Sequence, residues 1–331
     1  MASSTNRPRR AASLAVLAAA LANDDCPMVL APSPVAGGGL GVFSGRSVPK
    51  GKKPYEICPS IAVPYSATEA TALNHYVFGF NDTHATVSFG LAMMYNHSPR
   101  PHLHNQWTLA HERRNAPKDD GPVDVAFRPT DRAVARYEEV FDSYGGEQWF
   151  GGRGIDYKDA DAHETATAFP PGVLPGCGGT DVDVVEWVAV ATKAYAVGDV
   201  VEVSRGLVLP LGRFDGTLLR EFLLPLDGDL ALLLLGKGAI YVGDGNDRGD
   251  APNLELHPWP DAAETPASLA AAFRRAGEAE QGTILVAATA ATPISPGDKL
   301  TLDRGAWGLR SRAEDRGAWR PRSRDFLRGE F

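Results

Sequence analysis

The sequence predicts a mainly β protein with short helices, built from two copies of one fold, and three observations predict this class. The 331 residues include 35 glycines and 25 prolines, which favour many turns over long helices. Between these turns lie short apolar runs of the kind that form strands. Several blocks of the first half recur in the same order in the second half, as expected of an internal duplication.

The first 22 residues differ from the rest of the chain. Arg7, Arg9 and Arg10 precede the apolar run Ala11–Ala22. This order is typical of a cleavable secretory signal, and the acid-free, Ser-, Ala- and Arg-rich composition is equally typical of an organelle transit peptide. We therefore expect residues 1–22 to be a cleavable targeting segment that directs the protein to organelle import or to the secretory route. A disordered alanine-rich tail is the alternative.

Three pairs of blocks carry the duplication. Each pair keeps a glycine-containing turn or a pattern of apolar positions, and the order of the blocks is the same in both copies. The pairs are Lys50–Pro64 with Val197–Pro210, Gly90–Tyr95 (GLAMMY) with Gly236–Tyr241 (GKGAIY), and Tyr137–Gly145 (YEEVFDSYG) with Gly297–Gly305 (GDKLTLDRG). We expect one copy over residues 23–165 and a second over residues 166–305.

Within the second copy, Val200–Val208 and Leu230–Leu235 are predicted to be buried strands, and Ala267–Ala276 a short helix. Residues 306–331 form an arginine-rich tail in which a ten-residue segment, DRGAWGLRSR, recurs as DRGAWRPRSR. We expect this tail to be disordered. A basic peptide that binds an anionic surface is the alternative.

Three segments of the first copy carry the candidate chemistry. They are Pro34–Gly45 (PVAGGGLGVFSG), Tyr95–Ser98 (YNHS) and Glu138–Phe150 (EEVFDSYGGEQWF). In this order and spacing they resemble the SET-domain protein methyltransferases, which have a G-x-G segment, an N-H-S-x-x-P-N segment and an E-E-L-F-x-x-Y-G segment. The resemblance covers residues 26–155, and the second copy shows a weaker echo of it over residues 177–305.

The resemblance implies a SET-type β-clip fold, here as two tandem SET-like lobes, and the transfer of a methyl group from S-adenosyl-L-methionine to a protein lysine. It implies that Tyr144 is the catalytic residue, with its hydroxyl at the methyl-transfer channel. The residues implied to bind the cofactor are Gly39, Leu40, Gly41, Asn96 and His97.

The chemistry of methyl transfer suggests what else the site needs. A lysine amine has an ordinary pKa of about 10.4, so it must be desolvated and deprotonated before it can attack a methyl carbon. An aromatic-walled channel provides such dry surroundings, and a phenol can orient the amine without carrying a charge. Tyr76, Trp149 and Phe150 are the candidate walls of a substrate channel around Tyr144.

Two positions of the first copy depart from the family pattern. His102 stands where the family usually has asparagine, and Tyr137 replaces a turn glycine before Glu138. In the second copy the residues that would do the chemistry are lost, because Tyr144 aligns with Arg304 and Asn96 with Val242. We therefore expect the second copy to have a structural or substrate-docking role.

Composition limits the partners. The net charge of −8 argues against nucleic acid and fits a basic, lysine-containing protein or peptide substrate. The apolar runs are too short for a transmembrane helix, and the cysteines and histidines lack metal-ligand spacing, so we expect no metal. A monomer is expected. The alternative function is a non-catalytic SET-like module that binds a peptide or the cofactor.

Overall fold

The computed structural model of the protein describes residues 26–33, 40–52, 57–107, 122–129, 132–154, 182–185, 187–226, 228–242, 251–259 and 283–302. We call residues 26–154 the first half and residues 182–302 the second half. The predicted targeting segment, the predicted helix Ala267–Ala276 and the predicted tail all lie outside the described residues.

The first half consists of a small hairpin and a five-stranded antiparallel sheet. The hairpin is β1 (Met28–Pro32) with β2 (Leu40–Ser44). The sheet has the order β4 (Phe78–Gly79), β5 (His84–Ser88), β3 (Ile57–Pro64), β8 (Pro122–Pro129) and β7 (Leu103–Trp107). The remaining elements are short: α2 (Tyr65–Thr68), η1 (Ala72–His75), η2 (Leu91–Met94), β6 (Asn96–His97), β9 (Phe141–Asp142) and α4 (Glu147–Gly151).

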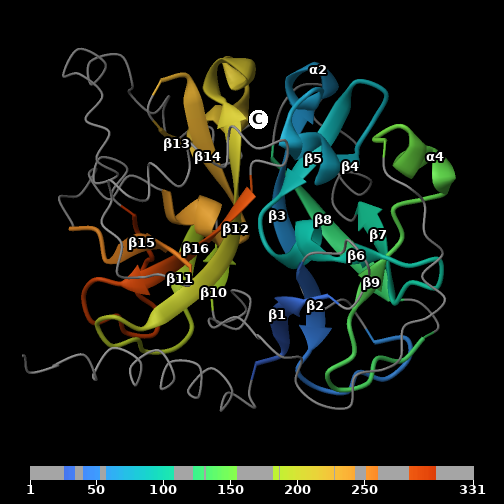
Figure 1. Ribbon diagram of the computed structural model, residues 1–331. Coiled ribbons are helices and arrows are strands. Elements are labelled where there is room, and N and C mark those ends of the chain that lie inside the picture. Colours follow the sequence, from blue (N-terminus) through green and yellow to red (C-terminus); the bar gives the residue numbers. More distant parts are fainter. Residues whose placement is uncertain are drawn as a thin grey trace, which may run out of the picture.

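The second half has the same plan. Its hairpin is β10 (Val182–Val185) with β11 (Val188–Ala191). Its sheet has the order β13 (Leu224–Pro225), β14 (Leu230–Leu235), β12 (Val200–Pro210), β16 (Thr283–Ala290) and β15 (Leu254–Pro258). Its short 3-10 helices are η4 (Leu211–Phe214), η5 (Leu218–Phe222) and η6 (Lys237–Val242). The two sheets lie side by side (Figure 1).

The registers of the two sheets correspond residue by residue. Ser60 of β3 pairs with Ser88 of β5, and Gly206 of β12 pairs with Leu234 of β14. The two pairs are related by the offset that separates GLAMMY from GKGAIY in the sequence. The predicted fold class, mainly β with short helices, is confirmed, as are the predicted strands in β12 and β14. The exact boundaries of the two copies stay a prediction.

The central strands form where the sequence is apolar over a whole run rather than at alternate positions. The LALLLL run of β14 is buried from Ala231 to Leu235, so both of its faces are covered. A strand covered on both faces reads as a continuous hydrophobic run. Gly206 of β12 allows β14 to approach, because a Cβ there would lie 2.6 Å from Cδ1 of Leu232.

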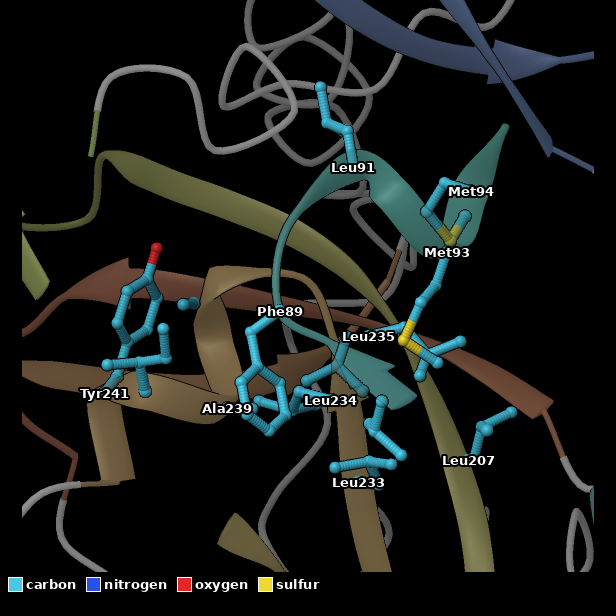
Figure 2. Packing of buried hydrophobic residues seen from close by; sticks show 14 of the residues in the cluster. Phe89, Leu91, Met93, Met94, Leu207, Leu233, Leu234, Leu235, Ala239 and Tyr241 are labelled. Carbon is cyan, nitrogen blue, oxygen red and sulfur yellow. The ribbon is translucent and has the colours of Figure 1, made fainter. Parts of the chain in front are cut away.

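One hydrophobic cluster runs through both halves. The contacts across it are reciprocal: η1 of the first half contacts β12, and its counterpart η5 of the second half contacts β3. The ring of Phe222, at the end of η5, lies 4.7 Å from the ring of Phe89 between centroids. Figure 2 shows Phe89 near Leu234 and Ala239 of the second half. The two halves therefore share a core, and each covers apolar surface of the other.

The sequence did not predict two local features, a disulfide and a left-handed backbone conformation. Cys26 is disulfide-bonded, whereas Cys58 is buried and not part of a disulfide. Tyr137, which replaces a turn glycine, adopts a left-handed backbone conformation with φ of 67°. The corresponding turn of the second half has Gly297 with φ of 92°. The turn thus requires the left-handed conformation in both halves. None of the helices in the described part of the chain is long and apolar enough to cross a membrane.

Truncation of Phe222 should destabilise the whole molecule, because its ring crosses from one half to the other. We expect Phe222→Ala to lower the free energy of unfolding by about 2 kcal/mol, less than for a fully buried phenylalanine because the ring is only half-buried. Val197→Ala, at a side chain that is 62% exposed, is the control and should change it by less than about 0.5 kcal/mol. Chemical denaturation measures both. Equal effects would contradict a shared core.

The turn at Tyr137 should prefer glycine over any residue with a Cβ. We expect Tyr137→Gly to be more stable than Tyr137→Ala by about 1 kcal/mol, since only alanine keeps the steric cost of the left-handed conformation. Both variants remove the same ring and the contact with the Arg136 guanidinium, so their difference isolates the backbone. Thermal or urea unfolding measures it, and an alanine variant of equal or higher stability would contradict the strain.

Candidate active site

The candidate site forms where two distant segments cross. β6 and β9 pair in parallel, which places Asn96 beside Phe141 and His97 beside Asp142. The crossing continues beyond the strands, since the Ser98 amide donates to the Asp142 carbonyl at 3.1 Å. The crossing therefore joins the N-H-S segment to the segment that ends in Tyr144.

The side chain of His102 holds this crossing together through two hydrogen bonds. Its ring is buried, its Nδ1 accepts a hydrogen bond from the Phe141 amide at 3.1 Å, and its Nε2 lies 3.0 Å from Oε1 of Glu138. With Nδ1 accepting from the Phe141 amide, the ring donates from Nε2 to the carboxylate. A histidine in place of the usual asparagine thus fits the loop.

Glu138 collects several donors in a buried position. Besides His102, it accepts hydrogen bonds from the Arg132 guanidinium at 2.6 Å and from the Ala135 amide at 2.8 Å. Burial alone would raise the pKa of Glu138, but the hydrogen bonds from His102 and Ala135 and the charge of Arg132 outweigh it and lower the pKa. Glu138 is therefore ionised, and its hydrogen bond to His102 helps to hold the β6–β9 crossing.

The Glu139 side chain points to β2, the strand that contains Gly41. Its Oε1 accepts from the Asn96 amide at 2.8 Å, and its Oε2 accepts from the Ser33 hydroxyl at 2.8 Å. Asn96 also donates to the Leu40 carbonyl at 3.1 Å. A Cβ on Gly41 would lie 2.1 Å from Oε1 of Glu139, so only glycine allows this approach. Burial raises the pKa of Glu139.

Tyr144 is anchored at both ends. Its amide donates to Nδ1 of His97 at 3.1 Å, and its hydroxyl donates to the carbonyl of Tyr95. Burial of the phenolic oxygen, followed by the negative charge of Asp142, raises the pKa of Tyr144 well above its ordinary value of 10. The residue is therefore a neutral phenol at physiological pH.

A small pocket of about 80 Å³ opens beside Tyr144. Most of its lining is aromatic or apolar, and the lining residues are His75, Tyr76, Val77, Phe78, Gly79, Ala92, Met93, Tyr95, Tyr144 and Trp149. The rings of Tyr144 and Trp149 lie 4.6 Å apart between centroids. The Arg153 guanidinium lies 4.1 Å from the Trp149 ring and donates to the Asn74 carbonyl at 3.1 Å. Arg153 thus links Trp149 of α4 to η1.

The structure gathers most of the predicted site residues. Tyr76, Trp149 and Tyr144 line one pocket, whereas Phe150 packs behind it, with its ring 4.9 Å from the rings of His97 and Trp149. Asn96, Leu40 and Gly41 meet at Glu139 rather than at the pocket, and His97 lies between Tyr144 and Phe150. Gly39 lies outside the described residues. Which of these residues touch a cofactor or substrate stays a prediction.

Sequence reasoning missed several residues of the site. Tyr95 and Glu139 stood inside the quoted motif segments, but only the fold shows that they anchor the Tyr144 hydroxyl and the Asn96 amide. His75 lies in none of the motif segments, yet it lines the pocket. Burial, aided by the charge of Arg153, lowers the pKa of His75, so it is neutral at pH 7. The described residues contain no group of His, Cys, Asp or Glu side chains that could hold a metal ion.

Comparison with known proteins gives little guidance. No family model matches the sequence, and no curated protein matches it. Among solved structures, the chain is similar to a Plasmodium falciparum protein described as a putative histone methyltransferase, with 22% sequence identity and a TM-score of 0.28. The match covers 37% of this chain and 96% of that one. At this TM-score the likeness is too weak to support a function.

The two adjacent glutamates should respond to acid in opposite directions. The lowered pKa of Glu138 means that its contribution to stability is present above its ordinary pKa of 4.5 and is lost as pH falls through the folded value. The raised pKa of Glu139 means that acid instead relieves a cost. We expect Glu138→Gln to flatten the loss of stability below pH 4.5. Above pH 4.5, we expect Glu139→Gln to remove the gain in stability that the wild type makes as pH falls toward 4.5. Unfolding free energies between pH 3 and 7 measure both slopes, and indistinguishable slopes would contradict the assignment.

Proposed function

We propose that the protein transfers a methyl group from S-adenosyl-L-methionine to the side-chain amine of a lysine in a basic protein or peptide. The observation that carries the proposal is the aromatic pocket at the β6–β9 crossing, into which Tyr144 presents a neutral phenol held by the Tyr95 carbonyl. The resemblance of the motif segments to SET-domain methyltransferases supports it independently.

The pocket suits an amine that must lose its charge. Tyr76, Phe78, Tyr144 and Trp149 are among the lining residues and give the pocket an aromatic wall. Desolvation disfavours the charged form, so the bound lysine loses its proton more readily than in water. The Tyr144 oxygen, whose position is fixed by Tyr95 and His97, can then orient the neutral amine.

The residues around Gly41 fit the cofactor. S-adenosyl-L-methionine supplies, when bound, an electrophilic methyl group on a sulfonium centre, and its ammonium and ribose hydroxyls need acceptors. The Glu139 carboxylate and the Leu40 carbonyl are acceptors at this place, and Glu139 is buried in a way that penalises its charge. A cationic ligand beside Glu139 would relieve that penalty. We therefore propose that Leu40, Gly41, Asn96 and Glu139 hold the cofactor.

The charge of the chain supports a basic substrate. The net charge of −8 favours encounter with a lysine-rich protein or peptide. In the first half, Glu139 forms an isolated β-bridge with Phe43. The corresponding β-bridge of the second half joins Lys299 to Val190, so Lys299 takes the place of Glu139. A cation there would repel the cofactor. We infer one cofactor per chain, bound by the first half.

A second candidate function is recognition of an ammonium group without reaction. Rings of Tyr76, Phe78, Tyr144 and Trp149 around one small pocket are also the chemistry that binds methylated ammonium ions. The two functions differ in one respect, because a binding module would hold a trimethyl-lysine peptide in the absence of cofactor and release no demethylated cofactor product.

Tyr144→Phe tests the proposed function directly. We expect turnover with S-adenosyl-L-methionine and a lysine-rich peptide to fall roughly 100-fold, because a positioned hydroxyl contributes about that factor or more. Calorimetry should find the affinity for S-adenosyl-L-methionine nearly unchanged, with one molecule bound per chain. Tyr137→Phe, which removes a hydroxyl from a turn outside the pocket, is the matched control and should keep full turnover. Full turnover of Tyr144→Phe, or two cofactors per chain, would refute the assignment.

A further inference from the structure

Arg205 is a charged residue in the middle of an apolar strand. It lies in β12, the central strand of the second sheet, and pairs with Leu235 of β14 and Leu285 of β16. Its neighbours on the same face of the strand, Val203 and Leu207, are fully buried. A guanidinium in such a place is costly unless it has a partner of matching geometry.

The partner belongs to the other half of the molecule. Nη1 of Arg205 donates to the Tyr76 hydroxyl at 2.7 Å. The guanidinium carbon also lies over the Tyr76 ring, 5.8 Å from its centre. Tyr76 follows η1 and its side chain lines the pocket beside Tyr144. Arg205 does not line the pocket, so its hydrogen bond reaches the pocket wall only through Tyr76.

We propose that Arg205 is a positioning residue for the pocket, supplied by the second half to the first: its guanidinium fixes the Tyr76 ring as the wall that aligns the substrate amine with Tyr144. The proposal rests on the proposed function. It gives the second half a part in the reaction, although that half has lost the residues that would do the chemistry.

The asymmetry of the two halves supports this role. The packing across the shared core is reciprocal, whereas the hydrogen bond between Arg205 and Tyr76 is not. At the offset that relates β3 to β12, Arg205 corresponds to Pro59 and Tyr76 to Phe222. Proline has no side-chain donor and phenylalanine has no acceptor. The hydrogen bond therefore exists only on the side where the aromatic pocket lies.

The charge of Arg205 also suits the chemistry. Burial is the main cause of the raised pKa of Tyr144, and the positive charge of Arg205 acts in the opposite direction, which places the guanidinium within electrostatic reach of the phenol. A permanent cation near the pocket disfavours an ammonium ion there relative to a neutral amine. Arg205 therefore favours the form of lysine that can accept a methyl group.

The test compares four single variants and one double variant of the full chain. Arg205→Met removes the donor and the charge, Arg205→Lys keeps the charge and one possible donor, and Tyr76→Phe removes the acceptor. Arg213→Met is the matched control, because Arg213 also bonds across the two halves, to the Ser66 carbonyl at 3.4 Å, but away from the pocket. The double variant combines Arg205→Met with Tyr76→Phe.

Steady-state kinetics with S-adenosyl-L-methionine and a lysine-rich peptide give the first readout. We expect Arg205→Met to lower kcat roughly tenfold or more, as misplacement of a wall residue does, with little change in the KM for the cofactor. Tyr76→Phe should match it, the double variant should be no worse than either single variant, Arg205→Lys should recover part of the loss, and Arg213→Met should stay within twofold. Multiplied losses in the double variant, or full turnover of Arg205→Met, would overturn the proposal.

Ring resonances of isotope-labelled tyrosines give a second readout that needs no turnover. Arg205→Met should shift the ring signals of Tyr76 and Tyr144, whereas Arg213→Met should leave them in place. If the wild-type chain transfers no methyl group, the proposed function fails, and these spectra still decide whether Arg205 positions Tyr76. Unchanged Tyr76 and Tyr144 signals in a folded Arg205→Met protein would overturn the positioning role.

Discussion

The parallel crossing of β6 and β9 is the constraint on which the rest of the site depends. Two residues on each side make the crossing, so it has little strength of its own and needs the side chains around it. His102 supplies this strength, because its buried ring bonds both the Phe141 amide and the Glu138 carboxylate. With the crossing fixed, the Tyr144 amide reaches His97 and its hydroxyl reaches the Tyr95 carbonyl.

Two neighbouring glutamates at this crossing have different surroundings and opposite pKa shifts. Glu138 is surrounded by donors, is held ionised and stabilises the fold. Glu139 has fewer donors and is more strongly penalised by burial, and it meets the chain at Gly41, where no side chain stands between them. The two carboxylates are one residue apart in the segment before β9, yet they have different partners. This difference separates a structural glutamate from a candidate ligand-binding one.

The shared core explains why a second half without the predicted chemistry is retained. β12 and β14 present continuous apolar surface to the first half, and Phe222 fills space beside Phe89. Arg205 of the second half also donates a hydrogen bond to the Tyr76 hydroxyl at the pocket. The two halves thus pack reciprocally, and the hydrogen bond between Arg205 and Tyr76 is made on one side of that packing only.

The sequence alone determined the fold class and the segments that matter. Runs such as Leu230–Leu235 are buried strands because an apolar run of that length has few other ways to leave water. Tyr144, Tyr76 and Trp149, predicted from the sequence as residues of one channel, line one pocket. Tertiary structure decided which atoms meet. The partners of Tyr144, Glu139 and Arg205 lie dozens of residues away or more, and neither periodicity nor composition carries information about such distant pairs. Hydrogen bonds depend on a few tenths of an ångström, and only the packed fold sets distances that finely.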